Sequence, residues 1–263
     1  MFNLAMLSIL RSFLASLLLL LSASCQADLI ETIGRIKPAI VGIGSFHKLR
    51  SPPVNFLGTG FVIGDGQHVI TNVHVISDLS DGKNKDALII MTGKGNKPEL
   101  RNTTIVAQDK EHDLALLRFE GTALPVMKLG NASKIKEGAL LAFTGFPIGM
   151  VLGFYPVTHR ATISSITPVI LPAQNTRQLD ATKIRQLQRS AYTVFQLDGT
   201  AYPGNSGSPL YDVDTGEVYG VVNMVFVKDK KESILSDPSG ISYAIPGNYI
   251  MDLLKQNGQM TSD

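Results

Sequence analysis

TAYPGNSGSPL, residues 200–210, places Ser206 between glycines, behind a proline and an asparagine, in a segment that otherwise has the composition of a β-strand. Glycine permits backbone conformations that other residues avoid. Two interpretations follow. The stretch is an ordinary tight turn, or it presents the Ser206 hydroxyl in a turn that leaves nearby backbone N–H groups free. The remainder of the sequence is needed to choose between them.

On both sides of Ser206 the chain consists of short apolar runs broken by glycine, proline and asparagine. These runs have strand length and are rich in β-branched residues, which predicts an all-β barrel or sandwich rather than alternating βαβ units. A helical pattern appears at residues 247–258 and, weakly, at residues 180–190. The strand-like runs are residues 39–46, 58–76, 87–93, 103–109, 113–120, 139–147, 161–171, 193–199, 217–227 and 242–246.

Composition describes a globular protein of 263 residues, 44% hydrophobic and 17% charged, which is enough to bury one large core or two small ones. The 24 basic and 22 acidic residues give a formal net charge of +2, and the lysines are scattered. We therefore expect no nucleic-acid partner. A single cysteine, Cys25, excludes an internal disulfide.

The first 27 residues resemble an export signal. A single charge, Arg11, precedes the apolar run SFLASLLLLLSASCQA, which is short for a membrane span. Cleavage after Ala27 would leave small residues at the positions that a signal peptidase reads, so we expect an exported, periplasmic or secreted protein. Lipidation of Cys25 is the alternative, although Ser22 stands where a lipobox usually has leucine. A retained membrane anchor is a third possibility.

The sequence contains the groups that acyl transfer by a serine requires. A hydroxyl needs a general base, a carboxylate that fixes the tautomer of that base, and N–H donors for the oxyanion. His74 follows the apolar run VITNV at the expected lip of a barrel, and Asp113 immediately precedes the apolar run LALLRF. With Ser206 they form a candidate set in the chain order His, Asp, Ser.

The motifs GTGFVI…VITNVHV, DLALL and PGNSGSPL, in this order, resemble the trypsin-fold serine proteases, specifically the bacterial HtrA-like (Deg-type) branch. The similarity runs from about Ile33 to Leu254. It implies two packed antiparallel six-stranded barrels with the site in the cleft between them, and a short C-terminal helix. We expect the first barrel in residues 28–125, and the second barrel with the helix in residues 126–263.

The resemblance also implies the roles of the site residues. His74 would be the general base, Asp113 would orient it, and Ser206 would be the nucleophile that forms an acyl-enzyme. The N–H groups of Gly204 and Ser206 would make the oxyanion hole, with no metal or organic cofactor. The expected partners are polypeptide substrates. The resemblance also implies a homotrimer, although the residues themselves do not give the oligomeric state. The alternative is a trypsin-fold binding or chaperone-like module with a latent active site.

Specificity should depend on the segment before the nucleophile and on the strand after it. Thr200 stands where a trypsin-like preference for lysine or arginine would need a carboxylate. We expect an apolar pocket that accepts small or medium aliphatic residues of unfolded or flexible polypeptides, because such a pocket cannot compensate a buried charge. Its expected lining residues are Thr200, Tyr202, Val222, Asn223, Met224, Ile241 and Tyr243.

The sequence departs from the family pattern in a few places. Ser208 stands where glycine is usual, and Val73 where asparagine or alanine is common. We expect no peptide-binding PDZ domain, since the sequence stops soon after the last helical pattern. The basic insertion at residues 173–190 is interpreted as a solvated loop, or alternatively as a flap that binds an acidic partner. Residues 228–233 are interpreted as a solvated hairpin tip.

Overall fold

The structure, a computed structural model, describes residues 29–80, 86–95, 97–148, 153–169, 192–223 and 241–259. Several expectations concern other residues and lie outside the described part of the chain. They are the export signal at residues 1–27 with Cys25, the insertion at residues 173–190, the tip at residues 228–233, and Met224.

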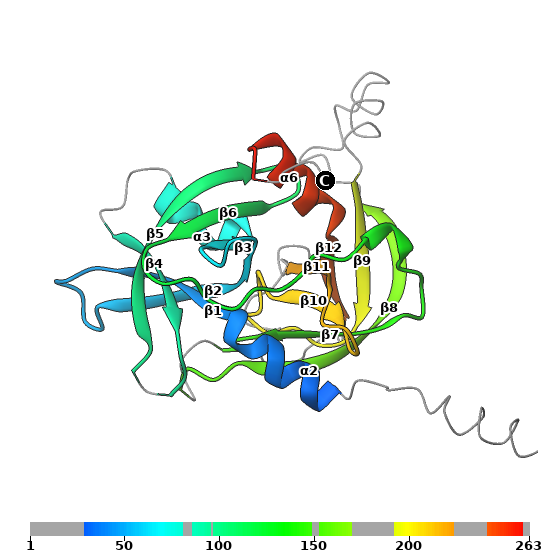
Figure 1. The fold of residues 1–263 in the computed structure, drawn as a ribbon, viewed down its shortest axis with the longest axis horizontal. Helices are drawn as coiled ribbons and strands as arrows, with labels where there is room; N and C mark the ends of the chain where they lie inside the picture. Colours follow the sequence, from blue (N-terminus) through cyan, green and yellow to red (C-terminus); the bar gives the residue numbers. More distant parts are fainter. Residues whose placement is uncertain are drawn as a thin grey trace, which may run out of the picture.

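Two closed antiparallel barrels of six strands lie side by side (Figure 1), as the family resemblance implied. Their strand orders are β1-β2-β3-β6-β5-β4 and β10-β11-β12-β9-β8-β7. The first barrel comprises β1 (Ile40–Phe46), β2 (Val54–Ile63), β3 (His68–Thr71), β4 (Ala87–Thr92), β5 (Glu99–Asp109) and β6 (Leu114–Phe119). The second comprises β7 (Leu140–Gly145), β8 (Val157–Val169), β9 (Tyr192–Asp198), β10 (Pro209–Asp212), β11 (Val218–Asn223) and β12 (Ile241–Pro246).

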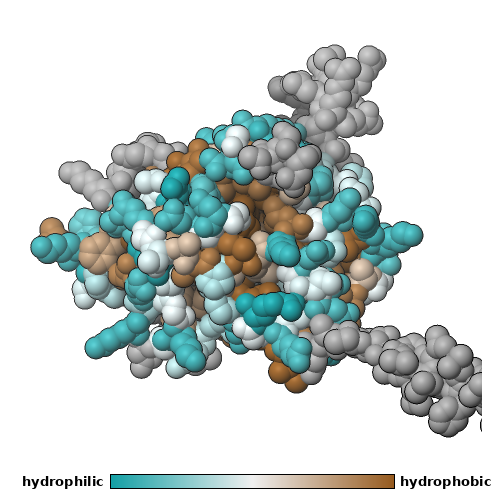
Figure 2. Space-filling model, viewed as in Figure 1, coloured by the Kyte–Doolittle hydropathy of each residue, from teal (hydrophilic) through white to brown (hydrophobic). Residues whose placement is uncertain are grey.

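The main hydrophobic core is continuous between the barrels. Strand β6 shows how the sequence supplies it, because Arg118 is its one exposed residue and the other five are buried. The core also takes in side chains of the second half, among them Phe146, Tyr211 and Ile245. On the face shown in Figure 2, hydrophobic side chains gather between the two halves and polar ones surround them. Burial of this shared surface fixes one barrel against the other.

The predicted C-terminal helix is present as α6 (Asn248–Gln256). Its buried residues Ile250, Leu253 and Leu254 recur at the spacing of one helical face. Although α6 follows the last strand of the second barrel, it also packs against β5 and β6 of the first. Figure 1 shows it lying across the top of both barrels. The helix therefore ties the two halves together.

Two further helices were not predicted. Helix α2 (Leu29–Ile36) packs Thr32 and Ile36, one turn apart, against the protein. Helix α3 (Val73–Ser80) begins right after β3, within a run that we interpreted as strand. Its valines and isoleucine have β propensity, which the tertiary fold overrides. Two short 3₁₀ helices, η1 (Lys37–Ala39) and η2 (Ala132–Lys134), complete the elements. Within the described ranges, no helix combines the length and apolarity of a membrane span.

Candidate active site

The first turn of α3 sets the position of His74. Strand β3 ends at Thr71, and the helix starts at Val73. The backbone N–H of His74 donates to Oδ1 of Asp113 over 2.8 Å. The side chain of His74 remains 29% exposed, so that its ring lies at the protein surface and is accessible to a substrate. The change from strand to helix thus carries the imidazole out of the barrel wall.

Asp113 occupies an unusual backbone conformation just before β6. Its φ of +54° lies in the left-handed region, which aspartate tolerates better than most residues. The carbonyl oxygen of Asp113 accepts hydrogen bonds from the Asn72 side-chain amide at 3.0 Å and from the Val73 N–H at 3.2 Å. These contacts hold the turn that aims the carboxylate at His74.

The structure brings His74, Asp113 and Ser206 together. Nδ1 of His74 lies 2.5 Å from Oδ2 of Asp113, and Nε2 lies 2.9 Å from Oγ of Ser206. Because an ionised carboxylate can only accept, Nδ1 carries the ring proton and Nε2 is left to accept from the Ser206 hydroxyl. Ser206 is 6% exposed. This arrangement can remove the hydroxyl proton as the oxygen attacks a carbonyl.

Asn223 supports the carboxylate from the second barrel. Its side-chain amide donates to Oδ2 of Asp113 over 2.8 Å, and Asn223 itself is fully buried. The sequence pointed to Asn223 only as a pocket wall, and it did not single out Asn72. A buried asparagine at the end of a strand is the signal that could have identified either, since its amide must find a partner.

Aromatic rings pack beside the Asp113 turn. The His112 ring stacks on Tyr249 of α6 with centroids 3.9 Å apart, and Tyr192 meets His112 edge to face at 5.0 Å. Nδ1 of His112 lies 2.6 Å from Oδ2 of Asp109. Burial, and next the negative charge of Asp113, raise the pKa of Tyr192 to about 12. Tyr192 therefore stays neutral and packs as an aromatic residue. The C-terminal helix thereby reaches the residue that precedes the carboxylate.

The nucleophile loop, residues 202–208, has the turn that the sequence suggested. Gly204 and Gly207 have φ values of +100° and +86°, which non-glycine residues rarely adopt. The Ser206 carbonyl accepts from the Thr59 N–H, and the Gly207 N–H donates to the Val222 carbonyl. Among the described residues, the N–H groups of Gly204 and Ser206 have no hydrogen-bond partner. They are available for an oxyanion.

Ser208, the main departure from the family pattern in this loop, is accommodated by a neighbouring glycine. Ser208 is fully buried and is not among the residues with positive φ. A Cβ at Gly145 would lie 2.0 Å from Oγ of Ser208, which is far inside contact distance. Glycine at position 145 thus leaves room for the hydroxyl.

The expected pocket residues lie on three segments. Thr200 and Tyr202 are partly exposed in the chain that follows β9. Val222 and Asn223 are fully buried in β11. Tyr243, in β12, is the partner of Asn223 in the antiparallel pair of β11 and β12. Ile241 is 43% exposed at the start of β12. Their role as a specificity pocket stays a prediction.

A protein-family comparison agrees with the fold and the arrangement of these residues. The model of the trypsin-like peptidase domain matches residues 58–221, which is more than half of the chain. The chain belongs to the trypsin-like peptidases. The matched region contains all three residues at the centre of the site.

Curated relatives place this peptidase in the HtrA-like branch. It is 31% identical over 216 residues to a probable periplasmic serine endoprotease DegP-like of Pseudomonas fulva, covering 81% of the chain and 37% of the relative. A protein of the same name from Halomonas elongata is 31% identical over 201 residues, covering 76% of the chain and 35% of the relative. The chain therefore spans little more than a third of the length of these relatives.

Two solved structures of the HtrA-type protease AlgW share the fold. A variant solved with a tripeptide gives a TM-score of 0.61 at 21% identity, covering 87% of this chain and 63% of the other. AlgW with a decapeptide gives 0.63 at 20% identity, covering 88% and 68%. At this level of identity the likeness establishes the arrangement of the barrels.

Proposed function

We propose that this protein is an exported serine endopeptidase that cleaves unfolded or flexible polypeptides. The observation that carries the proposal is the continuous contact from Asp113 through His74 to Ser206, at 2.5 Å and 2.9 Å. A module that only binds proteins needs no such hydrogen-bonded arrangement of the three side chains. In this proposal Ser206 is the nucleophile, His74 the general base and Asp113 the group that orients His74.

The reaction proceeds in two halves. In the first, Nε2 of His74 takes the proton of Ser206 Oγ while this oxygen attacks the peptide carbonyl. The resulting oxyanion is stabilised by the N–H groups of Gly204 and Ser206. His74 then returns the proton to the leaving amine, which gives an acyl-enzyme. In the second half, water activated by His74 hydrolyses the ester and restores Ser206.

The proposed substrates have small or medium aliphatic side chains before the scissile bond, such as valine, alanine, isoleucine or leucine. The pocket would lie between Thr200 and Tyr202 on one side and β11 and β12 on the other. Sequencing the fragments of a digested unfolded protein tests this preference. Cleavage mainly after lysine or arginine would refute the assignment of the pocket and leave the assignment of the nucleophile intact.

The proposed location is the periplasm. The relatives carry this location in their names, and residues 1–27 have the composition of an export signal. Removal of this segment after Ala27 is part of the proposal, with a lipid anchor on Cys25 as the alternative. Mass spectrometry of the exported protein separates the two, because diacylation adds several hundred daltons to an N-terminal cysteine.

Labelling with a fluorophosphonate probe tests the central claim. Wild-type protein should be labelled and should degrade unfolded casein. Ser206→Ala should abolish labelling and lower turnover by roughly 10⁴-fold to 10⁶-fold, with the fold intact. Ser165→Ala is a matched control, because its hydroxyl faces Glu137 at 3.3 Å and not the site. Equal proteolysis by Ser206→Ala and Ser165→Ala would refute the mechanism. A wild-type protein that binds casein but is not labelled would support the binding module.

A further inference from the structure

Thr59 connects the first barrel to the nucleophile loop through contacts that have no part in the proposed reaction steps. It lies in β2 and is fully buried. Its N–H donates to the Ser206 carbonyl at 2.9 Å, and its hydroxyl donates to the Gly204 carbonyl at 2.7 Å. The same hydroxyl oxygen accepts from the Phe146 N–H at 3.1 Å. One residue thus contacts the loop on both sides of Asn205.

The carbonyl groups of residues 202–206 each accept a hydrogen bond. Pro203 O accepts from the Ile148 N–H at 2.7 Å, and Asn205 O accepts from the Ser208 N–H at 3.0 Å. In a trans peptide the C=O and the following N–H point in opposite directions. The contact at Pro203 therefore sets the direction of the Gly204 N–H, and the contact at Asn205 sets that of the Ser206 N–H.

The peptide between these two planes joins Gly204 to Asn205. Glycine imposes the weakest conformational limits of any residue, so the backbone alone leaves this peptide free to rotate. Rotation would change ψ of Gly204 and φ of Asn205, and unless the two angles change by equal and opposite amounts it would also turn the neighbouring planes relative to each other. Two hydrogen bonds restrain this peptide. The Asn205 N–H donates to the Tyr202 carbonyl at 2.9 Å, and the Thr59 hydroxyl donates to the Gly204 carbonyl. Only the second comes from the first barrel.

We propose that Thr59 is a positioning residue of the oxyanion hole, whose hydroxyl holds the Gly204 carbonyl and so keeps the Gly204 and Ser206 N–H groups aligned in the absence of a partner protein. The inference rests on the proposed peptidase function and deepens it. The hydroxyl is buried, satisfied as donor and acceptor, and anchored on a barrel strand. The hole is thus formed by the fold of this chain, and the isolated protein should be active.

The experiment compares steady-state kinetics of wild type, Thr59→Val, Thr59→Ser and the control Thr144→Val on an unfolded protein substrate. Thr59→Val keeps the side-chain volume and the backbone bond to Ser206, and it loses only the hydroxyl. Since loss of one whole oxyanion donor costs roughly 10²-fold to 10³-fold, a misaligned hole should lower kcat by about 10-fold to 100-fold with KM within about 3-fold. Thr59→Ser should restore kcat to within about 3-fold of wild type, because it retains the donor.

Thr144→Val controls for the loss of a buried hydroxyl as such. Thr144 is fully buried, and its hydroxyl contacts Thr158 and Tyr211 rather than the loop. It should lower the melting temperature and leave kcat unchanged. Thr59→Val also removes the hydrogen-bond partner of two groups, the Gly204 carbonyl and the Phe146 N–H. If this variant fails to fold, Thr59→Cys takes its place. The thiol is a weaker donor, and an intermediate kcat is expected.

The outcomes distinguish the two proposals. An inactive and unlabelled wild-type protein contradicts the peptidase function and the preformed hole together. An active wild type whose folded Thr59→Val or Thr59→Cys variant keeps full kcat overturns the role of Thr59 alone. An equal fall in kcat for Thr144→Val, or a loss expressed as a higher KM, also overturns it, because either result indicates general damage to the fold.

Discussion

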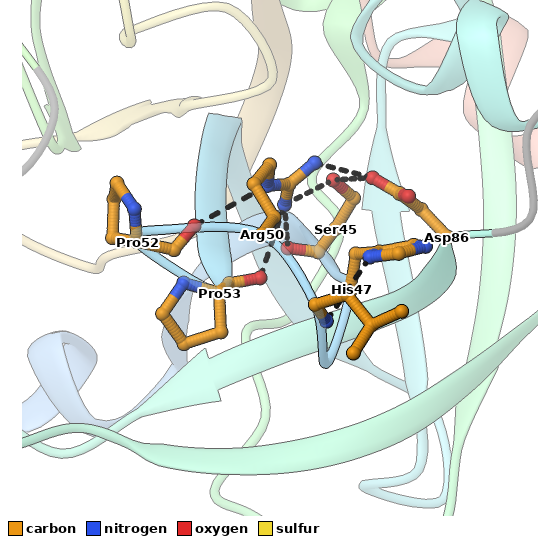
Figure 3. Close-up of polar contacts among 7 residues, drawn as sticks. Ser45, His47, Arg50, Pro52, Pro53 and Asp86 are labelled. Atoms are coloured by element: carbon orange, nitrogen blue, oxygen red, sulfur yellow. Dashed lines mark hydrogen bonds and ion pairs between the residues drawn. The ribbon is translucent and has the colours of Figure 1, made fainter.

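The nucleophile loop and the hairpin tip between β1 and β2, residues 47–53, are both proline-containing turns, but they are fixed in opposite ways. In the hairpin tip one side chain makes most of the contacts (Figure 3). Arg50 donates to the carbonyls of Ser45, Pro52 and Pro53 at 3.0–3.3 Å, and it pairs with Asp86 at 2.5 Å. Apart from Asp86, its partners lie within five residues of it along the chain.

The nucleophile loop is held mainly by groups distant in sequence. Thr59 and Gly204 are 145 residues apart, and the other long-range donors to the loop carbonyls are backbone N–H groups. A side chain such as Arg50, which contacts mainly residues near it in the sequence, can stabilise its own turn without affecting the rest of the molecule. A loop held across two barrels keeps its shape only if both barrels are folded and docked. The comparison predicts that a substitution in the hairpin tip changes only the stability of that turn. A substitution that displaces the nucleophile loop should also lower activity.

Of the substitutions that test this comparison, Gly207→Ala should have the largest effect. A Cβ at Gly207 would lie 2.0 Å from the Thr59 carbonyl and 2.5 Å from Oγ of Thr71, at a φ of +86°. The loop must therefore move away from β2. We expect kcat/KM to fall by roughly 10²-fold to 10³-fold, because displacement of reacting groups by about 1 Å has effects of that order. Casein degradation and probe labelling measure the loss.

Gly64→Ala is the matched control for that substitution. Gly64 also has a positive φ, +61°, but a Cβ at this position would meet no other atom within 4 Å. It should cost only the backbone strain of about 1 kcal/mol and leave the rate unchanged. If Gly207→Ala behaved like Gly64→Ala, close packing of the loop against the first barrel would have no role in activity.

A smaller and local effect is expected from Arg50→Ala. The hairpin tip should loosen, the melting temperature should fall by about 2–5 °C, and kcat should stay within about 2-fold of wild type. Burial opposes ionisation of Asp86, but hydrogen bonds from Ser45 and Arg50 and the charge of Arg50 prevail and lower the pKa of the Asp86 carboxyl from 3.8. The pairing therefore stabilises the fold above about pH 4 and is lost as pH falls through the lowered value.

Calorimetry at two pH values measures this effect. The difference in melting temperature between wild type and Arg50→Ala should be present at pH 7 and should shrink as the pH falls below the ordinary carboxyl pKa of 3.8. A 10-fold fall in kcat for Arg50→Ala would contradict the local character of the hairpin tip.

The smallest effect concerns His159, which packs beside the nucleophile loop. Its ring stacks on Phe143 with centroids 4.9 Å apart and lies 6.2 Å from the Tyr202 ring. Burial lowers the pKa of His159 from 6.5. The unfolded chain therefore takes up a proton at higher pH than the folded chain, and stability falls as pH drops below about 6.5.

Replacing the His159 imidazole by a ring that does not titrate should remove this dependence of stability on pH. His159→Phe should lose about 1–3 °C less in melting temperature than wild type between pH 8 and pH 5. Measurement of both proteins at both pH values cancels any change in packing that is independent of pH. An identical pH dependence would show that burial of His159 does not contribute to the acid sensitivity of this region.

Local patterns in the sequence were sufficient for much of the fold. Strand-length apolar runs identified most of the twelve strands, and the helical pattern at residues 247–258 identified α6. Strand β10 (Pro209–Asp212) is only four residues long and begins within the serine motif, so it gave no run of its own. Helix α3 was missed because its residues continue the apolar pattern of β3.

By itself the sequence determined the order of His74, Asp113 and Ser206 and the glycines that allow the turn at Ser206. Both are local properties, because residue type and φ preference belong to a position and its neighbours. Only the tertiary structure decided which distant groups meet. Ser206 lies 132 residues from His74, and Asn223 lies 110 residues from the carboxylate that it supports. Such contacts depend on strand register and on the docking of two barrels, which the apolar pattern of one strand does not specify.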